Sequence, residues 1–223
     1  MRQLDLRRPG LVSYQDALTL QRALVEDRRA GRIPDTLLLL QHPPVITLGV
    51  KGDGGRSNVI ADPARLSQLG IEISETGRGG DVTYHGPGQV VGYPILDLRP
   101  DRCDVHRYVR DLEEVMIRVC GEFGVTAGRV AGLTGTWIEG AKIGAIGIRI
   151  SRWITSHGFA FNVSTNLEHF NLIVPCGISG RGVTSLDRAT GQTIPIHAVE
   201  DAIVRHFCRV FQREATVAVP AIA

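Results

Sequence analysis

A glycine-rich segment, residues 76–89, holds the densest group of side chains in the chain that can do chemistry. Its glycines let the backbone approach a ligand closely and present N–H groups to it. Arg78 can supply a positive charge, Tyr84 an aromatic wall, and His85 an imidazole that titrates near neutral pH. The alternative is a glycine-rich hairpin loop that binds nothing. The segment is not a P-loop, because no Gly-Lys-Ser/Thr follows, and it lacks the Gly-x-Gly-x-x-Gly of a dinucleotide fold.

Lysine is rare in this chain, because only Lys51 and Lys142 stand among the 25 basic residues. Lys142 begins an apolar stretch, residues 143–150, that is typical of a strand buried on at least one face. Apolar surroundings disfavour the charged amine and lower its pKa, which would make Lys142 usable for proton transfer. The alternative is a lysine at a strand end whose ammonium group reaches water. Gly144 and Gly147 indicate that a ligand or another backbone packs closely against this strand.

Cys176 is the cysteine whose surroundings favour a nucleophile. It follows a short apolar run that ends in proline, and a glycine comes after it, so the thiol is expected on a sharp, exposed turn. Cys103, Cys120 and Cys208 fall in or beside predicted helices and are interpreted as structural. No Cys-x-x-Cys pair or Cys/His spacing fits a zinc site, so we expect reduced thiols and no metal.

A fourth group lies around His157, on a predicted strand. Gly158 and Ala160 share one face of this strand and leave room for a slender ligand, whereas Phe159 and Phe161 fill the other face. His157 is a further candidate base, ranked after His85. A packed core strand without a ligand is an equally good interpretation.

These groups need a scaffold, and the hydrophobic pattern predicts a few helices separated by clusters of strands. Ser13 and Asp104 are placed to cap two long helices, and Asp62 followed by proline opens a short one. The long helices are expected at about residues 14–29, from residue 105 to Gly121 or Gly124, and at about residues 196–211. Strands are expected at residues 36–40, 45–48, 72–73, 90–96, 136–138, 141–150 and 158–163. This order indicates an α+β fold with a mixed or antiparallel sheet rather than a regular βαβ array.

The composition is that of a globular chain with a sizeable core. The 223 residues are 43% hydrophobic and 22% charged, and the longest apolar runs are far shorter than the roughly 20 residues of a membrane span. The net charge of +2 argues against a nucleic-acid binder of the basic-patch type. The N-terminus is charged and lacks the apolar region of a secretory signal. We therefore expect a cytoplasmic protein with no nucleic-acid or membrane partner.

Taken together, these segments resemble the octanoyltransferase family of lipoate synthesis, also called lipoyl(octanoyl) transferases. Residues 78–93 match the family's signature throughout, and further motifs recur in the family's order across about residues 35–190. These motifs are Lys142-Ile143, Gly147, His157-Gly158-Phe159-Ala160 with Asn162, Pro175-Cys176-Gly177-Ile178 and Thr184-Ser185-Leu186. One small departure is Phe161, where family members often have leucine.

The resemblance implies the α+β fold of biotin/lipoate protein ligase catalytic domains, which is similar to that of class II synthetases. In this fold a mixed, largely antiparallel sheet is flanked by helices. Residues 1–223 would then form a single octanoyltransferase catalytic domain, with the part from about residue 165 as a candidate small subregion.

The resemblance also implies the reaction. An octanoyl or lipoyl group moves from the thioester of acyl carrier protein to a lysine amine. The acceptor is a lipoyl domain of a 2-oxoacid dehydrogenase complex or a glycine-cleavage H protein. No cofactor is implied, because the donor is already an activated thioester.

The resemblance assigns roles to individual residues. Cys176 becomes the acyl-thioester intermediate, Lys142 tunes it and serves as general acid or base, and His85 is a candidate assisting base. Whether Lys142 acts as a cation or as a neutral base stays open. The acyl-substrate contacts are Arg78, Gly79, Gly80, Asp81, Val82, Thr83, Tyr84 and His85, then Ala145, Ile146 and Gly147, then Gly158, Phe159 and Ala160.

Three other functions compete with this one. An ATP-dependent lipoate or biotin ligase would share the fold but would have no use for Cys176. A non-catalytic module that binds acyl groups or carrier proteins would keep the pocket, with an unactivated thiol. A cysteine hydrolase would pass the acyl group to water instead of an amine.

Overall fold

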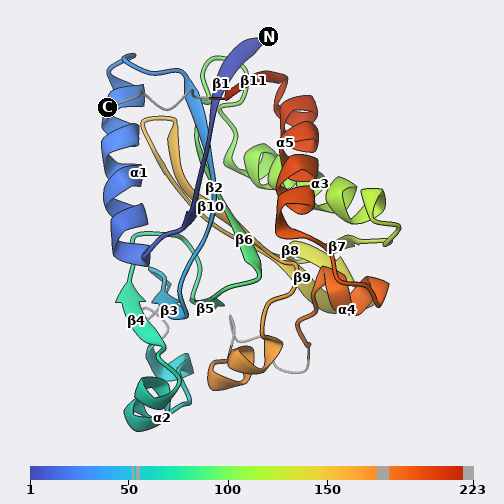
Figure 1. The fold of residues 1–223 in the computed structure, drawn as a ribbon. Helices are drawn as coiled ribbons and strands as arrows, with labels where there is room; N and C mark the ends of the chain where they lie inside the picture. The colour runs from blue at the N-terminus through green and yellow to red at the C-terminus, as the bar shows by residue number, and fades with distance from the viewer. Residues whose placement is uncertain (52, 54–55, 175–180, 218–223) are drawn as a thin grey trace.

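A large sheet runs through the middle of the computed structural model, which describes residues 1–51, 53, 56–174 and 181–217 (Figure 1). Its strands lie in the order β11-β1-β2-β6-β10-β9-β8-β7. β1 pairs in parallel with β11 and with β2, and the remaining pairs of this sheet are antiparallel. The predicted mixed, largely antiparallel sheet is therefore confirmed. Its strands are β1 (Arg2–Leu11), β2 (Asp35–Gln41), β6 (Gln89–Ile95), β7 (Gly128–Val130), β8 (Leu133–Ile138), β9 (Ala141–Ser151), β10 (Ile154–Asn162) and β11 (Arg213–Val217).

A second, three-stranded sheet contains part of the glycine-rich segment. β3 (Val45–Leu48) lies between β4 (Glu72–Glu75), which is parallel to it, and β5 (Val82–His85), which is antiparallel. The sequence pattern predicted no strand at β5. It forms one because Val82 and Tyr84, at alternate positions, pack into a small core beneath this sheet.

Three long helices cover the large sheet, α1 on one face and α3 and α5 on the other (Figure 1). They are α1 (Tyr14–Arg29), α3 (Val105–Glu122) and α5 (Ile196–Phe211). Ser13 and Asp104 cap α1 and α3 by accepting backbone N–H groups of the first turn, as predicted. The shorter elements are α2 (Pro63–Gln68), which Asp62 caps, α4 (Leu186–Thr190) and 3-10 turns at Arg56–Asn58 and Leu167–Leu172.

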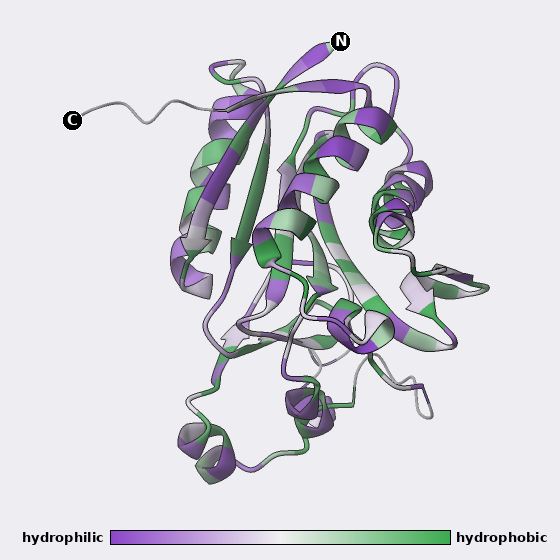
Figure 2. Ribbon diagram, turned by 45° about the vertical axis from the view of Figure 1, so that its right-hand side comes forward, coloured by the Kyte–Doolittle hydropathy of each residue, from purple (hydrophilic) through white to green (hydrophobic). Residues whose placement is uncertain are grey.

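β2 accounts for the unbroken apolar run in the first quarter of the chain. Leu37 and Leu39 pack into the core with α3 and α5, whereas Leu38 and Leu40 pack into the core with α1. A strand that is covered on both faces needs apolar side chains at every position instead of at every second one. Figure 2 shows the same arrangement, with hydrophobic colouring along the central strands and mixed colouring around the helices.

The start of β2 holds a buried cluster of ion pairs. The Asp35 side chain is 2% exposed, and its carboxylate oxygens lie 2.8 Å from Arg28 Nε and 2.8 Å from Arg213 Nε. This cluster ties α1, β2 and β11 together. Because these charges are buried away from water, removing one partner would leave the others without compensation and would destabilise the fold.

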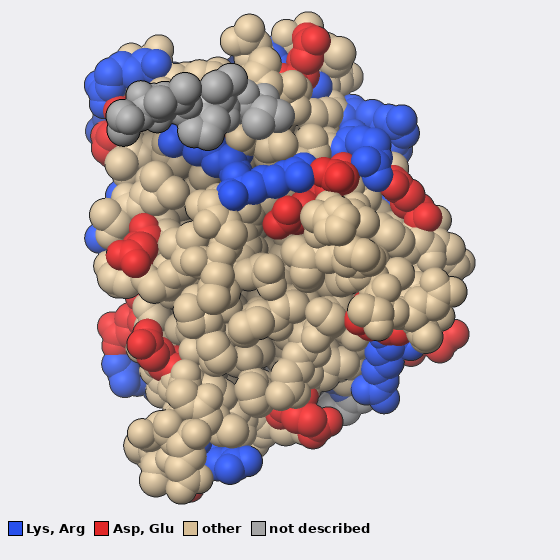
Figure 3. Space-filling view, in the orientation of Figure 1, with Lys and Arg blue, Asp and Glu red and all other residues tan. Residues whose placement is uncertain are grey.

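The described surface carries charges of both signs. On the face in Figure 3, basic and acidic side chains lie near one another toward the edges, around a broad uncharged centre. Within the described ranges, no helix has the length and apolar character needed to cross a bilayer. In the same ranges, no group of three or more His, Cys, Asp or Glu side chains is arranged to hold a metal ion. Of the cysteines predicted to be structural, Cys120 is buried and Cys208 half-buried, but Cys103 is exposed before α3.

Candidate active site

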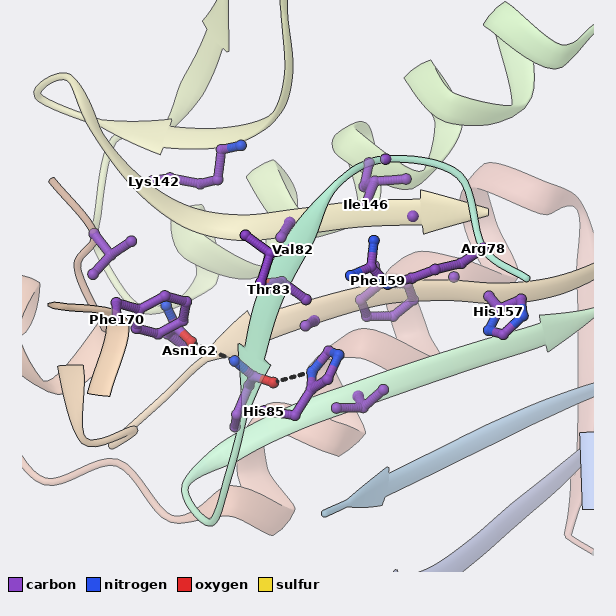
Figure 4. A pocket seen from close by; sticks show the side chains of 18 of the residues that line it. Arg78, Val82, Thr83, His85, Lys142, Ile146, His157, Phe159, Asn162 and Phe170 are labelled. Carbon is purple, nitrogen blue, oxygen red and sulfur yellow. Dashed lines mark hydrogen bonds between the residues drawn. The ribbon is translucent and has the colours of Figure 1, made fainter. Parts of the chain in front are cut away.

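A narrow cavity of about 90 Å³ lies between β5 and the β9–β10 pair. Lys142 on β9 lies at one end and His157 on β10 at the other, with Val82 and Ile146 between them (Figure 4). Ile148 is the cross-strand partner of His157, and the six steps along β9 from residue 142 to residue 148 span about 20 Å at the rise of a strand. The walls are mainly apolar with a few polar groups, which suits a slender apolar ligand.

Most of the predicted binding residues line this cavity. They are Arg78, Gly80, Val82, Thr83, His85, Lys142, Ala145, Ile146, Gly147, Gly158, Phe159 and Ala160. Gly79, Asp81 and Tyr84 do not line it. Asp81 accepts a hydrogen bond from Asn58 Nδ2 at 2.8 Å, the Tyr84 hydroxyl lies 2.8 Å from His169 Nδ1, and the Gly79 N–H donates to a β9 carbonyl at 2.9 Å. These three residues hold the glycine-rich segment in place.

Sequence reasoning assigned no ligand contact to several other residues that line the cavity. They are Tyr14, Gln89, Val91, Tyr93, Ile143, Asn162, Phe170 and Val183. A signal existed for Gln89 and Asn162, because amide side chains are uncommon in otherwise apolar strands. Tyr14 and Phe170 offered none, since both fit the apolar faces of their own elements.

Gly147 and Gly158 are small because neighbouring groups pack closely against them, and close packing of another backbone is one of the two alternatives predicted for Gly147. A Cβ atom on Gly158 would lie 2.2 Å from the carbonyl oxygen of Gly92 on β6. A Cβ atom on Gly147 would lie 3.0 Å from Arg78 Cδ and 3.0 Å from the Gly79 carbonyl oxygen. These glycines let neighbouring backbone close up. The side chains that stay small and face the ligand space are Ala145 and Ala160, which are cross-strand partners.

Arg78 lies buried at the cavity wall, where its guanidinium group is held by neutral acceptors. It donates to the Thr47 carbonyl at 2.7 Å, to Thr47 Oγ1 at 2.9 Å and to the Gly79 carbonyl at 3.1 Å. These contacts fix its position. Its charge disfavours protonation of His85 and His157 and contributes to the lowered pKa of each.

A chain of buried hydrogen bonds fixes His85. Asn162 Nδ2 donates to the Thr184 carbonyl at 3.0 Å, so Asn162 Oδ1 is left to accept from Gln89 Nε2 at 2.9 Å. Gln89 Oε1 then accepts from His85 Nδ1 at 2.7 Å (Figure 4). The proton of the neutral imidazole therefore sits on Nδ1, and Nε2 keeps its lone pair. The Thr184 N–H in turn donates to the Lys142 carbonyl at 2.9 Å, so this chain ends beside Lys142.

Three histidines around the cavity are neutral at physiological pH. Burial lowers the pKa of His85 to about 3, with the neighbouring His42 adding to the effect. Burial also lowers the pKa of His42 to about 4 and that of His157 to about 4. His42 Nδ1 donates to the Val12 carbonyl at 2.8 Å, and the Tyr93 hydroxyl lies 2.7 Å from its Nε2. We call the end of the cavity at His157 its inner end. Aromatic rings and neutral histidines surround it, and Arg78 is the one charged side chain among the described residues that line this end.

Lys142 lies where β8, β9 and the chain after residue 180 meet. Its Nζ lies 4.7 Å from the centre of the Trp137 ring, a cation–π contact. Its backbone N–H donates to the Gly182 carbonyl at 2.9 Å. Cys176, with Pro175, Gly177 and Ile178, lies outside the described residues.

Comparison with known proteins identifies the family of this chain. The family model of the lipoyl protein ligase A/B catalytic domain matches residues 13–208. The chain belongs to this family. Among lipoyl protein ligase A/B relatives, the octanoyltransferase of Acidobacterium capsulatum is 52% identical over 93% of this chain and 90% of its own length. The octanoyltransferase of Myxococcus xanthus is 51% identical over 99% of this chain, which spans 63% of that protein.

Solved structures of lipoate and biotin protein ligases share the fold. A lipoate protein ligase from Thermoplasma acidophilum with bound lipoic acid superposes with a TM-score of 0.75 at 15% identity, covering 99% of this chain and 90% of that chain. A biotin protein ligase from Aquifex aeolicus matches with a TM-score of 0.55 at 12% identity, covering 95% of this chain and 71% of that chain. The predicted biotin/lipoate protein ligase fold is confirmed. The relatives near 50% identity also confirm the predicted octanoyltransferase family and a transferase activity in lipoate biosynthesis.

Proposed function

We propose that this chain transfers an octanoyl group from acyl carrier protein to a lysine of a lipoyl domain in two steps. In the first, the Cys176 thiolate attacks the carrier thioester, a new sulfur–acyl bond forms, and the carrier thiol leaves. In the second, the lysine amine attacks the Cys176 thioester, an amide forms, the amine loses a proton and the thiolate returns. The lipoyl domains of 2-oxoacid dehydrogenases and the glycine-cleavage H protein are the proposed acceptors.

The observation that carries this proposal is the narrow apolar cavity that begins at Lys142. A slender saturated chain can lie along β9 and β10, where Ala145 and Ala160 leave the space and Ile146 and Val82 supply apolar walls. Each buried methylene group contributes about 0.8 kcal/mol to binding. The mainly apolar walls suit a saturated acyl chain better than a charged substrate.

Lys142 is the proposed proton carrier: as an ammonium it favours the Cys176 thiolate and gives its proton to the leaving carrier thiolate, and the neutral amine that remains then accepts the proton of the incoming lysine. Its position at the end of the cavity supports this role, as does its backbone bond to Gly182, six residues after Cys176 in the chain. A cation close to a thiol lowers the thiol's pKa from about 8.5 and raises the thiolate fraction. The Trp137 ring restricts where the ammonium group can lie.

His85 is proposed to assist as a hydrogen-bond acceptor. Its pKa of about 3 makes it a weak base, since a general base works best when its pKa lies near the working pH. Its unprotonated Nε2 can accept a hydrogen bond from the attacking amine without carrying the proton away. Lys142 is therefore the preferred acceptor of that proton.

Intact-mass analysis of the protein mixed with octanoyl-carrier protein tests the proposal. We expect the mass of one octanoyl group to appear on the wild type and on Cys103→Ser, an exposed cysteine control. Cys176→Ser should gain no such mass. Lys142→Ala should form the adduct slowly and pass it on slowly, whereas Lys51→Ala, a change at the chain's other lysine, should behave as the wild type. Adding a lipoyl domain should discharge the adduct.

Other outcomes of the same experiment point to the competing functions. Modification of the lipoyl domain by free octanoate that depends on ATP would make the chain a ligase. Release of octanoic acid without an amine acceptor would make it a hydrolase. Absence of any modification would leave a binding module. We further propose that the chain acts as one catalytic domain in the cytoplasm.

A further inference from the structure

A second cavity, of about 330 Å³, lies between α1 and the β9–β10 hairpin. Figure 1 shows this hairpin beside the helix. The narrow cavity between β5 and the β9–β10 pair is called the acyl cavity from here on. His157 lines both cavities, so the second one lies just beyond the inner end of the acyl cavity. Its lining is Leu18, Gln21, Arg22, Val25, Glu26, Arg29, Gly77, Arg149, Ser151, Ile154, Ser156 and His157.

Positive charge at this cavity exceeds negative charge. Three arginines line it, and the only acid is Glu26, which lies 2.5 Å from Arg29 Nη1. In the described part of the chain, neither Arg22 nor Arg149 has a carboxylate within 4.0 Å. Gly77 makes room for one of them, because a Cβ atom there would lie 2.5 Å from Arg149 Nη1. Two guanidinium groups therefore lie at the rim without a counter-charge.

Three residues of the cavity lining have buried hydrogen-bonding atoms that no described protein group satisfies. Gln21 is 2% exposed, and its Oε1 accepts the His157 backbone N–H at 2.8 Å, which leaves Nε2 as a donor without a partner. Arg29 Nε is a second buried donor without a partner, and His157 Nδ1 is a third unpaired atom. Buried donors without partners are uncommon, because each loses its hydrogen bonds to water. They match an oxyanion, which offers only acceptors.

The remaining lining restricts the kind of anion. Leu18, Val25 and Ile154 give the cavity apolar walls next to the arginines. We propose that this cavity binds a small organic anion, a carboxylate with a short apolar body. The carboxylate would lie between the guanidinium groups and Gln21 Nε2, since a planar guanidinium pairs well with a carboxylate. The apolar body would lie against the three aliphatic side chains.

A ligand bound at this site should change the pKa of His157. The charges of Arg149 and Arg22 help to lower the pKa of His157, in addition to burial. A bound anion offsets those charges and should raise the pKa of His157 from about 4. His157 gives the proposal a readout that a nonspecific surface ion would not affect.

Amide and imidazole NMR spectra of the full chain, titrated with butyrate, test the proposal. We expect saturable shifts at Gln21 and Ser156, with a dissociation constant of about 1 mM or tighter. Arg149→Gln and Arg22→Gln should each weaken binding about tenfold or more, within the range of a charge-assisted hydrogen bond. Arg152→Gln is the matched control, because Arg152 lies on the same hairpin but outside the cavity, and it should change binding less than twofold.

Four results would overturn the proposal. Equal weakening by Arg152→Gln would show only a general charge effect, and equal binding of uncharged butyramide would exclude an anion site. Equal affinity for inorganic phosphate would remove the apolar body from the ligand class. Shifts confined to Thr83 and Ala145 would place butyrate in the acyl cavity instead. None of these results bears on acyl transfer through Cys176.

Discussion

Ala160→Leu should shorten the acyl chain that this enzyme accepts. Ala160 faces Ala145 on β9 and Val91 on β6, and all three line the acyl cavity. Ala160 pairs with Ala145, which is three residues along β9 from Lys142, or about 10 Å by the rise of a strand. A leucine at this position would fill the middle of the cavity and leave the part near Lys142 open.

The expected loss of kcat/KM follows from the number of methylene groups that leucine excludes from the cavity. If leucine excludes the last three, the octanoyl chain loses about 2.4 kcal/mol of apolar contact, at about 0.8 kcal/mol for each group. This corresponds to about a 60-fold lower kcat/KM for octanoyl transfer. A butanoyl chain ends before the obstruction and should keep its kcat/KM. Packing the larger side chain should also cost about 1–3 kcal/mol of folding stability.

The assay compares kcat/KM for butanoyl-, hexanoyl- and octanoyl-carrier protein in the wild type and in Ala160→Leu. Phe161→Leu is the control, because the next residue of β10 packs on the opposite face of the sheet, in the core with α3 and α5. The control should affect the three substrates equally. If Ala160→Leu also lowers transfer equally for the three chain lengths, the acyl chain does not lie along β10 and the reasoning is wrong.

Further predictions concern the hydrogen bonds, the buried ion pairs and the histidines. Gln89→Glu should raise the pKa of His85 by about 1–3 units, because a carboxylate would replace the amide oxygen 2.7 Å from Nδ1; an unchanged imidazole titration by NMR would contradict the hydrogen-bond chain. Asp35→Ala should destabilise the fold by about 3–5 kcal/mol, because two arginines lose their buried partner; urea denaturation measures this, and a loss below about 1 kcal/mol would refute it. Stability should fall as pH drops from about 6.5 toward 4, because the unfolded chain takes up protons on His42, His85 and His157 that the folded chain resists. The slope is about 1.4 kcal/mol per pH unit for each histidine, and His42→Gln should reduce it; an unchanged slope in that variant would count against a neutral buried His42.

The amphipathic elements were predictable from the sequence. The bounds of α1 and α5 and the caps of α1, α2 and α3 agree with the pattern of apolar residues and the capping side chains. β2, β3 and β6 were predicted from β-branched and apolar runs. These signals are local, so a single sequence reveals them.

The elements that the sequence did not predict depend on distant partners. β1 is charged along much of its length and becomes a strand because β2 and β11 pair with it on either side. β7 is three residues long, and β11 follows directly after α5. β2 and β3 adjoin in the chain, yet each joins a different sheet. Local pattern carries no information on such pairing.

The motifs of the candidate site were predictable from the sequence, but the arrangement of their side chains around the cavity was not. The glycine-rich segment, Lys142 and the strand at Ala160 do converge on one cavity. Tyr14 and Phe170 also reach that cavity, which only the tertiary fold can show. Tyr84 was assigned to ligand contact because a single sequence does not reveal that its ring packs into the core beneath β5. Gly158 does line the cavity, but a single sequence does not reveal that the Gly92 carbonyl lies opposite it.

The parallel pairing of β1 with β11 has a consequence for how the chain folds during synthesis. Arg2 on β1 pairs with Arg213 on β11, so β1 cannot complete this pairing until about 210 further residues have been synthesised. α5, which supplies Phe207 and Phe211 to the main core, is also made late. Until then, one edge of β1 and part of the apolar core have no cover, and both can associate with other chains. The ribosome-bound chain should therefore need a chaperone until residues 196–217 have emerged, and native structure should form after that point rather than progressively.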